Sequence, residues 1–271
     1  MYFLSSINEN LPPAHQIKAM MMSIACKQAF QFSRFSDGEL FMLLNKEIQL
    51  TPDGAWIDGR KVNSQKYPDH DCKYFNPLSD MAIVAELKSA LIYSHPNYVK
   101  GLPLPCCVGR EMFNEMLNLL HCNLSQWSTA NLLINGNYPF FISKILPILL
   151  LRPLIVVANK RASFCRMPSV FEHVSIDDNA KACINSYSLS LINILSELDA
   201  EQRSNLIILF AASYISNILI FRLSKLFPDV TMIDVGTAIH PLINLEVSRH
   251  YLDLYWSDPS SYSYHQCDMV L

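Results

Sequence analysis

The chain has 271 residues, of which 51% are hydrophobic and 17% charged, with a formal net charge of −3. This composition excludes an intrinsically disordered protein, and the chain is long enough to bury a sizeable core. Because there is no basic surplus, the sequence predicts no nucleic acid partner.

Glycine and cysteine usage exclude several common kinds of site. The chain has seven glycines and contains neither a G-x-G-x-x-G nor a G-x-x-x-x-G-K motif, which argues against a glycine-rich phosphate loop. Its eight cysteines include no C-x-x-C pair, so we expect no structural zinc site. The first residues show no basic segment or cleavage site, and we therefore expect a cytoplasmic protein.

Hydrophobic periodicity predicts helices and strands in alternation along the whole chain. The predicted helices cover residues 14–28, 39–44, 78–92, 110–120, 140–151, 179–198 and 214–226. The predicted strands cover residues 29–35, 97–103, 130–135, 154–158, 170–176, 206–211 and 230–236. This alternation predicts an α/β fold with a mainly parallel sheet.

No linker, repeat or low-complexity segment divides the chain, so we predict one domain over residues 1–271. Residues 47–76 are rich in Pro, Gly, Asp and Asn, and we expect a long loop of the kind that often carries function. Its residues 69–71, DHD, gather potential metal ligands, although a charged loop tip is usually solvated. We expect the aromatic and polar tail after His250 to wrap over the surface.

The most apolar region, residues 132–158, raises the question of a membrane span. Its longest run without a charge or polar interruption is residues 145–151, whereas a spanning helix needs about 20 apolar residues. We expect a buried helix followed by a buried strand. Peripheral contact with the inner face of a membrane stays open.

The most informative stretch is residues 29–44, where an alternating run passes through a Ser-Asp-Gly turn into a predicted helix. Such a turn places polar groups at the carboxyl edge of a sheet, where open α/β sheets bind their ligands. Asp37 and Glu39 flank one glycine, so both carboxylates can point into the same small volume. Mg²⁺ and Mn²⁺ are often held by one or two such carboxylates together with substrate phosphates. Arg34 could bind a phosphate or orient the carboxylates.

The same residues also make a good helix start. Ser36 or Asp37 can serve as the N-cap, and Glu39 in the first turn favours the helix dipole. Because a helix start also presents the backbone amides that a diphosphate binds, the capping and ligand-binding interpretations are compatible.

Five further polar residues are candidates, each with a structural alternative. Asp234 ends a predicted strand, where it could contact a ribose, a sugar hydroxyl or a metal, or cap the next segment. His240 could act as the general base for an acceptor hydroxyl, or be structural. Lys160 and Arg161 follow a buried strand and could meet phosphates, or form a solvated basic pair. Asn179 could contact the donor, or cap its helix.

Several motifs, in this order, resemble the GT-D glycosyltransferases, bacterial enzymes with a Rossmann-like fold and an N-terminal D-x-E motif. The R-F-x-D-G-E signature of that family stands at residues 34–39 as RFSDGE. The other matching segments are SQKY at 64–67, NYVKGLP at 97–103, DNA at 178–180 and IDVG at 233–236. The family pattern has a glycine where this chain has Ser36, and a glycine-containing turn where it has ASY at 212–214. The resemblance covers about residues 15–240.

The resemblance implies a Rossmann-like sheet with helices on both faces, and a metal-dependent sugar transfer. The donor would be a nucleotide sugar, typically a UDP-sugar, and the acceptor a glycan in bacterial surface polysaccharide or glycoprotein assembly. Asp37 and Glu39 would hold Mn²⁺ or Mg²⁺ and the donor diphosphate, with Asp234 as the next functional residue.

Two other functions are compatible with the same sheet edge. One is a metal-dependent phosphohydrolase, and the other is a non-catalytic nucleotide-binding or scaffold subunit of a glycan-assembly complex. The sequence does not distinguish donor sugars, acceptors or stereochemical outcomes, and it leaves a homo-oligomer open.

Overall fold

The structure is a computed structural model that describes residues 2–119, 127–178 and 180–263. Its centre is a seven-stranded sheet with the order β7-β6-β1-β11-β10-β8-β9, and all neighbouring strands are parallel. The strands are β1 (Gln31–Arg34), β6 (Tyr98–Leu102), β7 (Trp127–Thr129), β8 (Leu154–Asn159), β9 (Val170–Ile176), β10 (Ile207–Ala211) and β11 (Thr231–Asp234). The predicted α/β class with a parallel, Rossmann-like sheet is confirmed.

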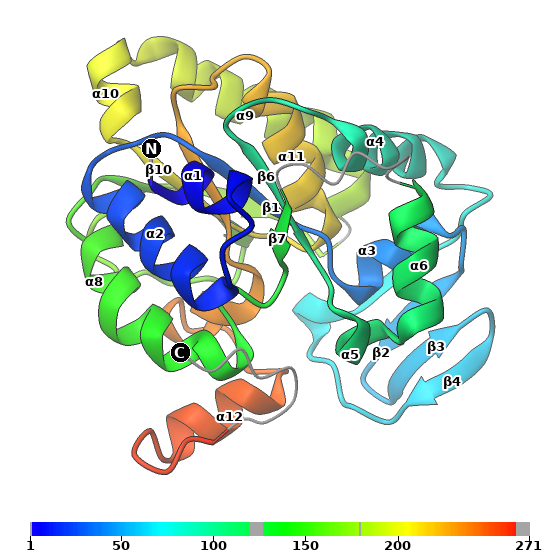
Figure 1. The fold of residues 1–271 in the computed structure, drawn as a ribbon. Coiled ribbons are helices and arrows are strands. Elements are labelled where there is room, and N and C mark those ends of the chain that lie inside the picture. The colour runs from blue at the N-terminus through cyan, green and yellow to red at the C-terminus, as the bar shows by residue number, and fades with distance from the viewer. Residues whose placement is uncertain (1, 120–126, 179, 264–271) are drawn as a thin grey trace.

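Helices cover both faces of this sheet (Figure 1). One face carries α3 (Asp37–Leu43), α4 (Met81–Ile92), α6 (Arg110–Leu119), α9 (Ile184–Glu197) and α11 (Tyr214–Ser224). The other face carries α1 (Tyr2–Asn8), α2 (Pro13–Ala25) and α8 (Leu146–Leu149). Because side chains alternate along a strand, Ile208 and Phe210 of β10 join the first core, and Ile207 and Leu209 join the second.

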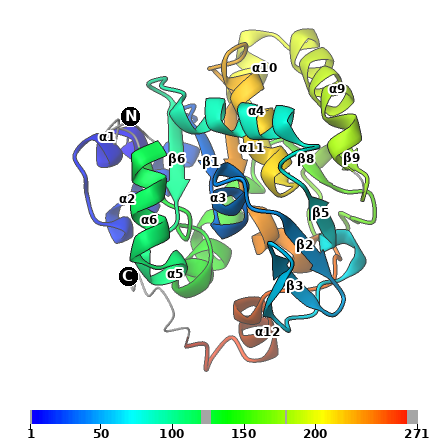
Figure 2. The ribbon, with the colours of Figure 1, turned by 90° about the vertical axis from the view of Figure 1, so that its right-hand side faces the viewer.

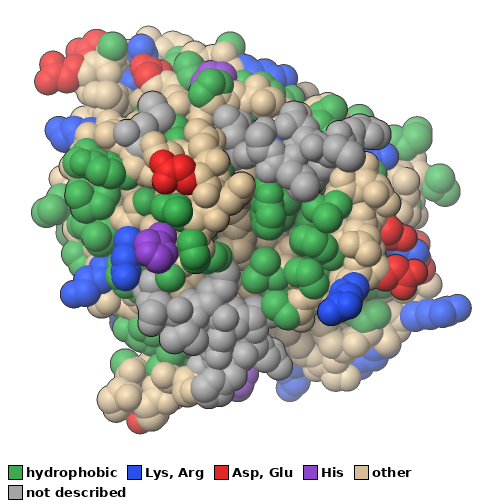
Figure 3. Space-filling model, in the orientation of Figure 1, with side chains coloured by type: hydrophobic (Ala, Val, Ile, Leu, Met, Phe, Trp, Pro, Cys, Tyr) green, Lys and Arg blue, Asp and Glu red, His purple; other side chains and the backbone are tan. Residues whose placement is uncertain are grey.

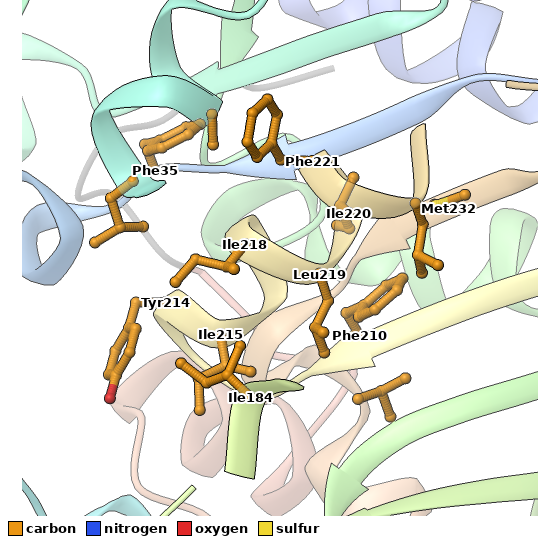
Figure 4. Packing of buried hydrophobic residues seen from close by; sticks show 14 of the residues in the cluster. Phe35, Ile184, Phe210, Tyr214, Ile215, Ile218, Leu219, Ile220, Phe221 and Met232 are labelled. Atoms are coloured by element: carbon orange, nitrogen blue, oxygen red, sulfur yellow. The ribbon is translucent and has the colours of Figure 1, made fainter. Parts of the chain in front are cut away.

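Helix α11 is the most deeply buried helix on its face of the sheet. It packs against β1, α4 and α9, and ten of its 11 residues are buried. Figure 4 shows Leu219 and Ile220 of this helix near Phe210 and Met232 of the strands. Its buried Asn217 donates hydrogen bonds to Ser33 Oγ at 3.1 Å and to the carbonyl oxygen of Arg34 at 2.7 Å. The end of β1 is therefore tied to the core beneath it.

The range 47–76 was predicted as a loop, and this prediction is wrong. The structure places a four-stranded antiparallel sheet there, in the order β4-β3-β2-β5. Its strands are β2 (Ile48–Thr51), β3 (Gly54–Ile57), β4 (Arg60–Asn63) and β5 (Lys73–Phe75). Strands of three or four residues are too short to show alternation, whereas the Asp58-Gly59 turn, with φ of 49° and 73°, is a typical hairpin signal. Figure 2 shows this second sheet beside α3.

Two other predicted elements also differ from the structure. The strand expected at 130–135 lies instead at β7, and turns follow it. The helix expected at 140–151 is a composite of α7 (Tyr138–Phe140), a π-helical segment (Phe141–Ile145) and α8, because Pro147 removes a backbone donor. The tail begins with a regular helix, α12 (His250–Ser257). The remaining short elements are η1 (Asp69–Asp71), α5 (Pro105–Val108), η2 (Asn135–Asn137), η4 (Ala180–Cys183), α10 (Ala200–Asn205) and η5 (Gly236–Leu242).

Helix length and hydropathy bear on membrane insertion, and the distribution of surface charge bears on nucleic acid binding. Within the described ranges, no helix combines the length and the hydropathy needed to cross a bilayer. On the face shown in Figure 3, Lys and Arg side chains are dispersed among polar and hydrophobic ones. This dispersal agrees with the net charge of −3.

Candidate functional site

The end of β1 and the start of α3 form the first part of the site. Ser36 is the N-cap of α3, and its backbone N–H donates to Glu39 Oε2 at 3.0 Å. The Ser36 hydroxyl donates to the same oxygen. The capping interpretation is therefore confirmed, with Ser36 as the cap. Asp37 is exposed and Glu39 is only 4% exposed, so the two carboxylates lie in different environments.

Asp234 joins this group from β11, the neighbour of β1 in the sheet. Its side chain is buried, and Oδ1 accepts a hydrogen bond from the Gly236 N–H at 3.0 Å. Burial raises the pKa of Asp234 to about 7; the positive charge of Arg34 opposes this rise and the negative charge of Glu39 adds to it. The structure thus brings together Arg34, Glu39 and Asp234, which we call the corner cluster.

Arg34 is held in a fixed position within the corner cluster. Its Nε donates to the carbonyl oxygen of Ala130 at 2.7 Å. Gly236 has a φ of +50°, and a Cβ at this position would overlap Nη1 of Arg34. Glycine is therefore needed in the IDVG segment for two reasons: its backbone conformation and the close approach of the guanidinium.

Tyr214 connects the corner cluster to the next strand, β10. Burial raises its pKa, and the negative charges of Asp80 and Glu39 add to the rise, so its hydroxyl lies within the field of both carboxylates. Asp80 is itself paired with Lys181 at 3.0 Å. The preceding residue, Ser213, has a φ of 52°, a left-handed conformation for which glycine is the usual choice.

A cavity of about 110 Å³ lies beside Tyr214. We call it the edge cavity, because Asn159, Ile176 and Ala211 line it from the carboxyl ends of β8, β9 and β10. The connection after β8 packs on one face of the sheet, whereas α11 follows β10 on the other. Such a divergence of neighbouring connections opens the crevice in which α/β sheets bind ligands.

The strand β5 of the second sheet, the preceding η1 and the segment η5 form the opposite wall of the edge cavity. The lining side chains from these parts include His70, Asp71, Lys73 and His240. Lys73 Nζ donates to Ser213 Oγ at 2.6 Å, which joins the two sheets across the cavity. Sequence reasoning singled out residues 69–71 but missed Lys73, because the strand that positions it was not recognised.

His240 is almost fully buried in this wall, at 4% exposure. Its ring centroid lies 5.3 Å from that of His70. Burial lowers the pKa of His240 to about 4, against the opposing effect of the Asp71 carboxylate, so the imidazole is neutral near pH 7. Burial also acts to raise the pKa of Asp71, but the charges of Arg249 and His240 and the Ser248 hydroxyl hold it below its usual value.

Two predicted donor-contact residues, Lys160 and Arg161, stand apart from the corner cluster. Lys160 pairs with Asp177 at 3.0 Å, and Arg161 pairs with Asp178 at 2.6 Å. Both pairs are exposed to solvent, at the rim where β8 and β9 end. Asn179 lies outside the described residues.

In the described part of the chain, no group of three or more His, Cys, Asp or Glu side chains is arranged to hold a metal ion. Asp37 and Glu39 supply at most two carboxylates, one exposed and one buried against Ser36. Such a number suits Mg²⁺ or Mn²⁺ only where substrate phosphates supply further ligands.

Comparisons with known proteins establish the fold. No protein-family model and no curated protein matches the chain. Two solved structures are similar over 93% of this chain and 86% of theirs. One is described as the selenomethionine-substituted structure of domain of unknown function 1792, with 14% identity and a TM-score of 0.53. The other, with 13% identity and a TM-score of 0.50, is described as that highly conserved domain with a distinct glycosyltransferase fold. The chain therefore has a glycosyltransferase-like fold.

Proposed function

We propose that the protein is a metal-dependent glycosyltransferase that moves a sugar from a nucleotide donor, most simply a UDP-sugar, to an acceptor glycan. The observation that carries the proposal is the corner cluster. Arg34, Glu39 and Asp234 are all buried at the carboxyl edge of adjacent strands, in a sheet with a glycosyltransferase-like fold. Buried charged groups at a sheet edge are typical of ligand sites.

The chemistry of the corner cluster suits a diphosphate and a hard cation. Asp37 and Glu39 would hold Mn²⁺ or Mg²⁺, which when bound offsets the charge that develops on the leaving diphosphate. Arg34 offers its Nη groups to phosphate oxygens while Ala130 anchors its Nε. Burial raises the pKa of the Asp234 carboxyl group to about 7, and a cation bound nearby would favour its charged form.

The remaining predicted residues have secondary roles in this proposal. His240 would accept a proton from the acceptor hydroxyl, and Lys160 and Arg161 would reach the donor from the rim only after leaving their carboxylate partners. We place the reaction in bacterial surface polysaccharide or glycoprotein assembly, on the cytoplasmic side of the membrane.

Nucleotide binding with and without metal tests the proposal. We would measure thermal shifts and calorimetric affinities for UDP, GDP, CMP and their sugars, with Mn²⁺ or with EDTA. The wild-type protein should bind one nucleotide class in the presence of Mn²⁺. Glu39→Gln keeps a side-chain oxygen for the Ser36 cap but loses the charge, so its affinity should fall by at least about tenfold, or about 1.4 kcal/mol.

Glu197→Gln is the matched control, because Glu197 is an exposed residue of α9 outside the cluster. Its affinity should equal that of the wild type. Metal-independent binding that survives in Glu39→Gln would contradict the proposal. Cleavage of generic phosphoesters without sugar transfer would identify a phosphohydrolase, and the absence of any nucleotide binding would favour a scaffold subunit.

A further inference from the structure

We propose that the edge cavity binds the hydroxyl groups of a neutral sugar, with His240 Nδ1 as the atom that accepts a hydroxyl hydrogen. The assignment of this sugar as the acceptor rests on the proposed transferase function. Binding of the sugar in the cavity does not depend on that function, and the two can be tested separately.

His240 has an unsatisfied hydrogen-bonding atom in the wall of the edge cavity. Its ring makes a hydrogen bond with the backbone of Glu246, whereas Nδ1 is buried and has no partner in the described part of the chain. With Nε2 as the N–H donor toward the Glu246 backbone, the neutral ring would keep a bare acceptor at Nδ1. A buried acceptor without a partner is costly, and a ligand hydroxyl would satisfy it.

His70, in the same wall, also has a ring nitrogen without a hydrogen-bond partner within the described ranges, and this atom, Nε2, is buried. Both imidazoles line the edge cavity, and their rings are in contact. Two unsatisfied nitrogen atoms at one cavity indicate a polar ligand with more than one hydrogen-bonding group.

The charges that line the edge cavity bear on whether its ligand is neutral or anionic. The cavity lining includes three carboxylates, those of Asp71, Asp177 and Asp178, and two ammonium groups, those of Lys73 and Lys181. Lys181 is already paired with Asp80. Asp177 and Asp178 are likewise paired, with Lys160 and Arg161, so Asp71 and Lys73 remain as one charge of each sign. A phosphoryl group would find no surplus of positive charge, whereas a hydroxyl can donate to a carboxylate or an imidazole and accept from a lysine. The lining therefore favours a neutral polyol over an anion.

The edge cavity lies beside the corner cluster, where the proposed transfer reaction would take place. Tyr214 lines the cavity and also lies in the field of Glu39, so the cavity adjoins the corner cluster. In the transfer, the acceptor oxygen would form the bond to the anomeric carbon while its proton passes to Nδ1 of His240. The bond between that carbon and the diphosphate oxygen would break, and its electron pair would leave with the diphosphate.

Asp71 is a positioning residue in this arrangement. Ser248 Oγ donates to Asp71 Oδ2 and fixes the carboxylate. The negative charge acts on the His240 ring and would stabilise the imidazolium formed when the proton arrives. Asp71→Asn should therefore lower the apparent pKa of the base in the pH profile of sugar transfer, which a merely structural role would not do.

Saturation-transfer difference NMR on the full chain tests the sugar site, since it detects weak ligands directly. The probes are the methyl glycosides of glucose, galactose, mannose and N-acetylglucosamine, with inorganic phosphate as the competing anion. The wild-type protein should show saturation transfer to at least one glycoside, and phosphate should not displace it. His240→Gln and Lys73→Met should each weaken binding by about tenfold, the effect expected from one lost hydrogen bond to a buried group.

Lys61→Met is the matched control, because Lys61 is an exposed residue of β4 in the same sheet and does not line the cavity. It should bind the glycoside as the wild type does. The proposal is overturned if no glycoside binds, if phosphate competes, or if Lys73→Met and His240→Gln both bind normally. Calorimetry with UDP and Mn²⁺ on the same samples reports separately on the proposed function, so failure of one does not conceal the other.

Discussion

Two carboxylates and one guanidinium determine the chemistry of the corner cluster at the scale of single residues. Glu39 is held by Ser36, Arg34 by Ala130 and Asp234 by Gly236, so each charged side chain has a backbone or hydroxyl partner of its own. The cluster nevertheless has one negative charge more than it has positive charges. Burial is still what raises the pKa of Asp234, because the charge of Arg34 opposes the rise more strongly than the charge of Glu39 adds to it.

Asp234 should make the stability of the metal-free protein fall as the pH rises. Its pKa is about 7 in the folded chain against an ordinary value of 3.8, so the folded state binds the proton more tightly than the unfolded state does. The stabilisation is fully present below pH 4 and is lost between about pH 4 and pH 7. A difference of about three pKa units corresponds to at most about 4 kcal/mol.

Asp234→Asn isolates this contribution, because asparagine resembles the protonated acid and does not titrate. In EDTA, urea unfolding should show that the variant gains stability relative to the wild type as the pH is raised from 5 to 8. His240 contributes with the opposite sign, since its pKa is lowered, but its effect cancels in the comparison. A constant difference between the two proteins over this range would contradict the prediction.

At the scale of elements, two strand-to-helix turns shape the site through residues in the left-handed conformation. Gly236 follows β11 with a φ of 50°, and Ser213 follows β10 with a φ of 52°. The first allows Arg34 to approach the backbone, and the second brings a hydroxyl to Lys73. In this chain Ser213 adopts the positive φ at the turn after β10, where the family that the sequence resembles has a glycine-containing turn.

Gly236→Ala should destabilise the protein and disturb Arg34. The left-handed conformation costs an alanine about 1–2 kcal/mol, and the overlap of its Cβ with Nη1 of Arg34 adds to this cost. We expect a loss of about 2 kcal/mol or more in urea unfolding, together with weaker nucleotide binding.

Gly38→Ala is the matched control, because a Cβ at Gly38 would meet no atom within 4 Å. In α3 the change should be neutral, or stabilising by up to about 1 kcal/mol, since alanine favours helix more than glycine does. Equal effects of the two substitutions would show that contact with Arg34 is not what requires a glycine at position 236.

The elements predicted correctly from the sequence are those whose hydrophobic pattern extends over enough residues to be identified. The apolar runs of β8 and β10 and the turn from β1 into α3 were predicted within one or two residues. The second sheet was missed because its strands have three or four residues, and alternation over so few positions is indistinguishable from a loop. As a consequence, Lys73 was absent from the predicted site.

At the scale of the whole molecule, the edge cavity is assembled from segments far apart in the sequence. Its walls combine the second sheet, the ends of β8, β9 and β10, and η5. The motifs at 34–39 and 233–236 predicted polar residues at the ends of two strands, and these residues meet in the corner cluster because β1 and β11 are neighbours in the sheet. No local pattern could predict the cavity, since its shape depends on how the second sheet sits against the first.

Arg152 stabilises the whole molecule by joining helices that are far apart in the sequence. It is buried at 5% exposure. Its guanidinium donates to the carbonyl oxygens of Ile24 at 3.0 Å, Ser204 at 2.7 Å and Asn205 at 2.9 Å. These bonds connect the C-terminal end of α2 with that of α10. No other single side chain described above caps two helices at once.

Arg152→Ala should therefore lower the free energy of unfolding by about 3 kcal/mol, because it leaves several buried carbonyl groups without donors. Urea denaturation would measure the loss. Arg166→Ala is the matched control, since Arg166 is exposed and makes a single bond, to the carbonyl oxygen of Pro241 at 3.2 Å, so its loss should stay below about 1 kcal/mol. If both variants unfolded at the same urea concentration, Arg152 would not join these helices in the way its hydrogen bonds indicate.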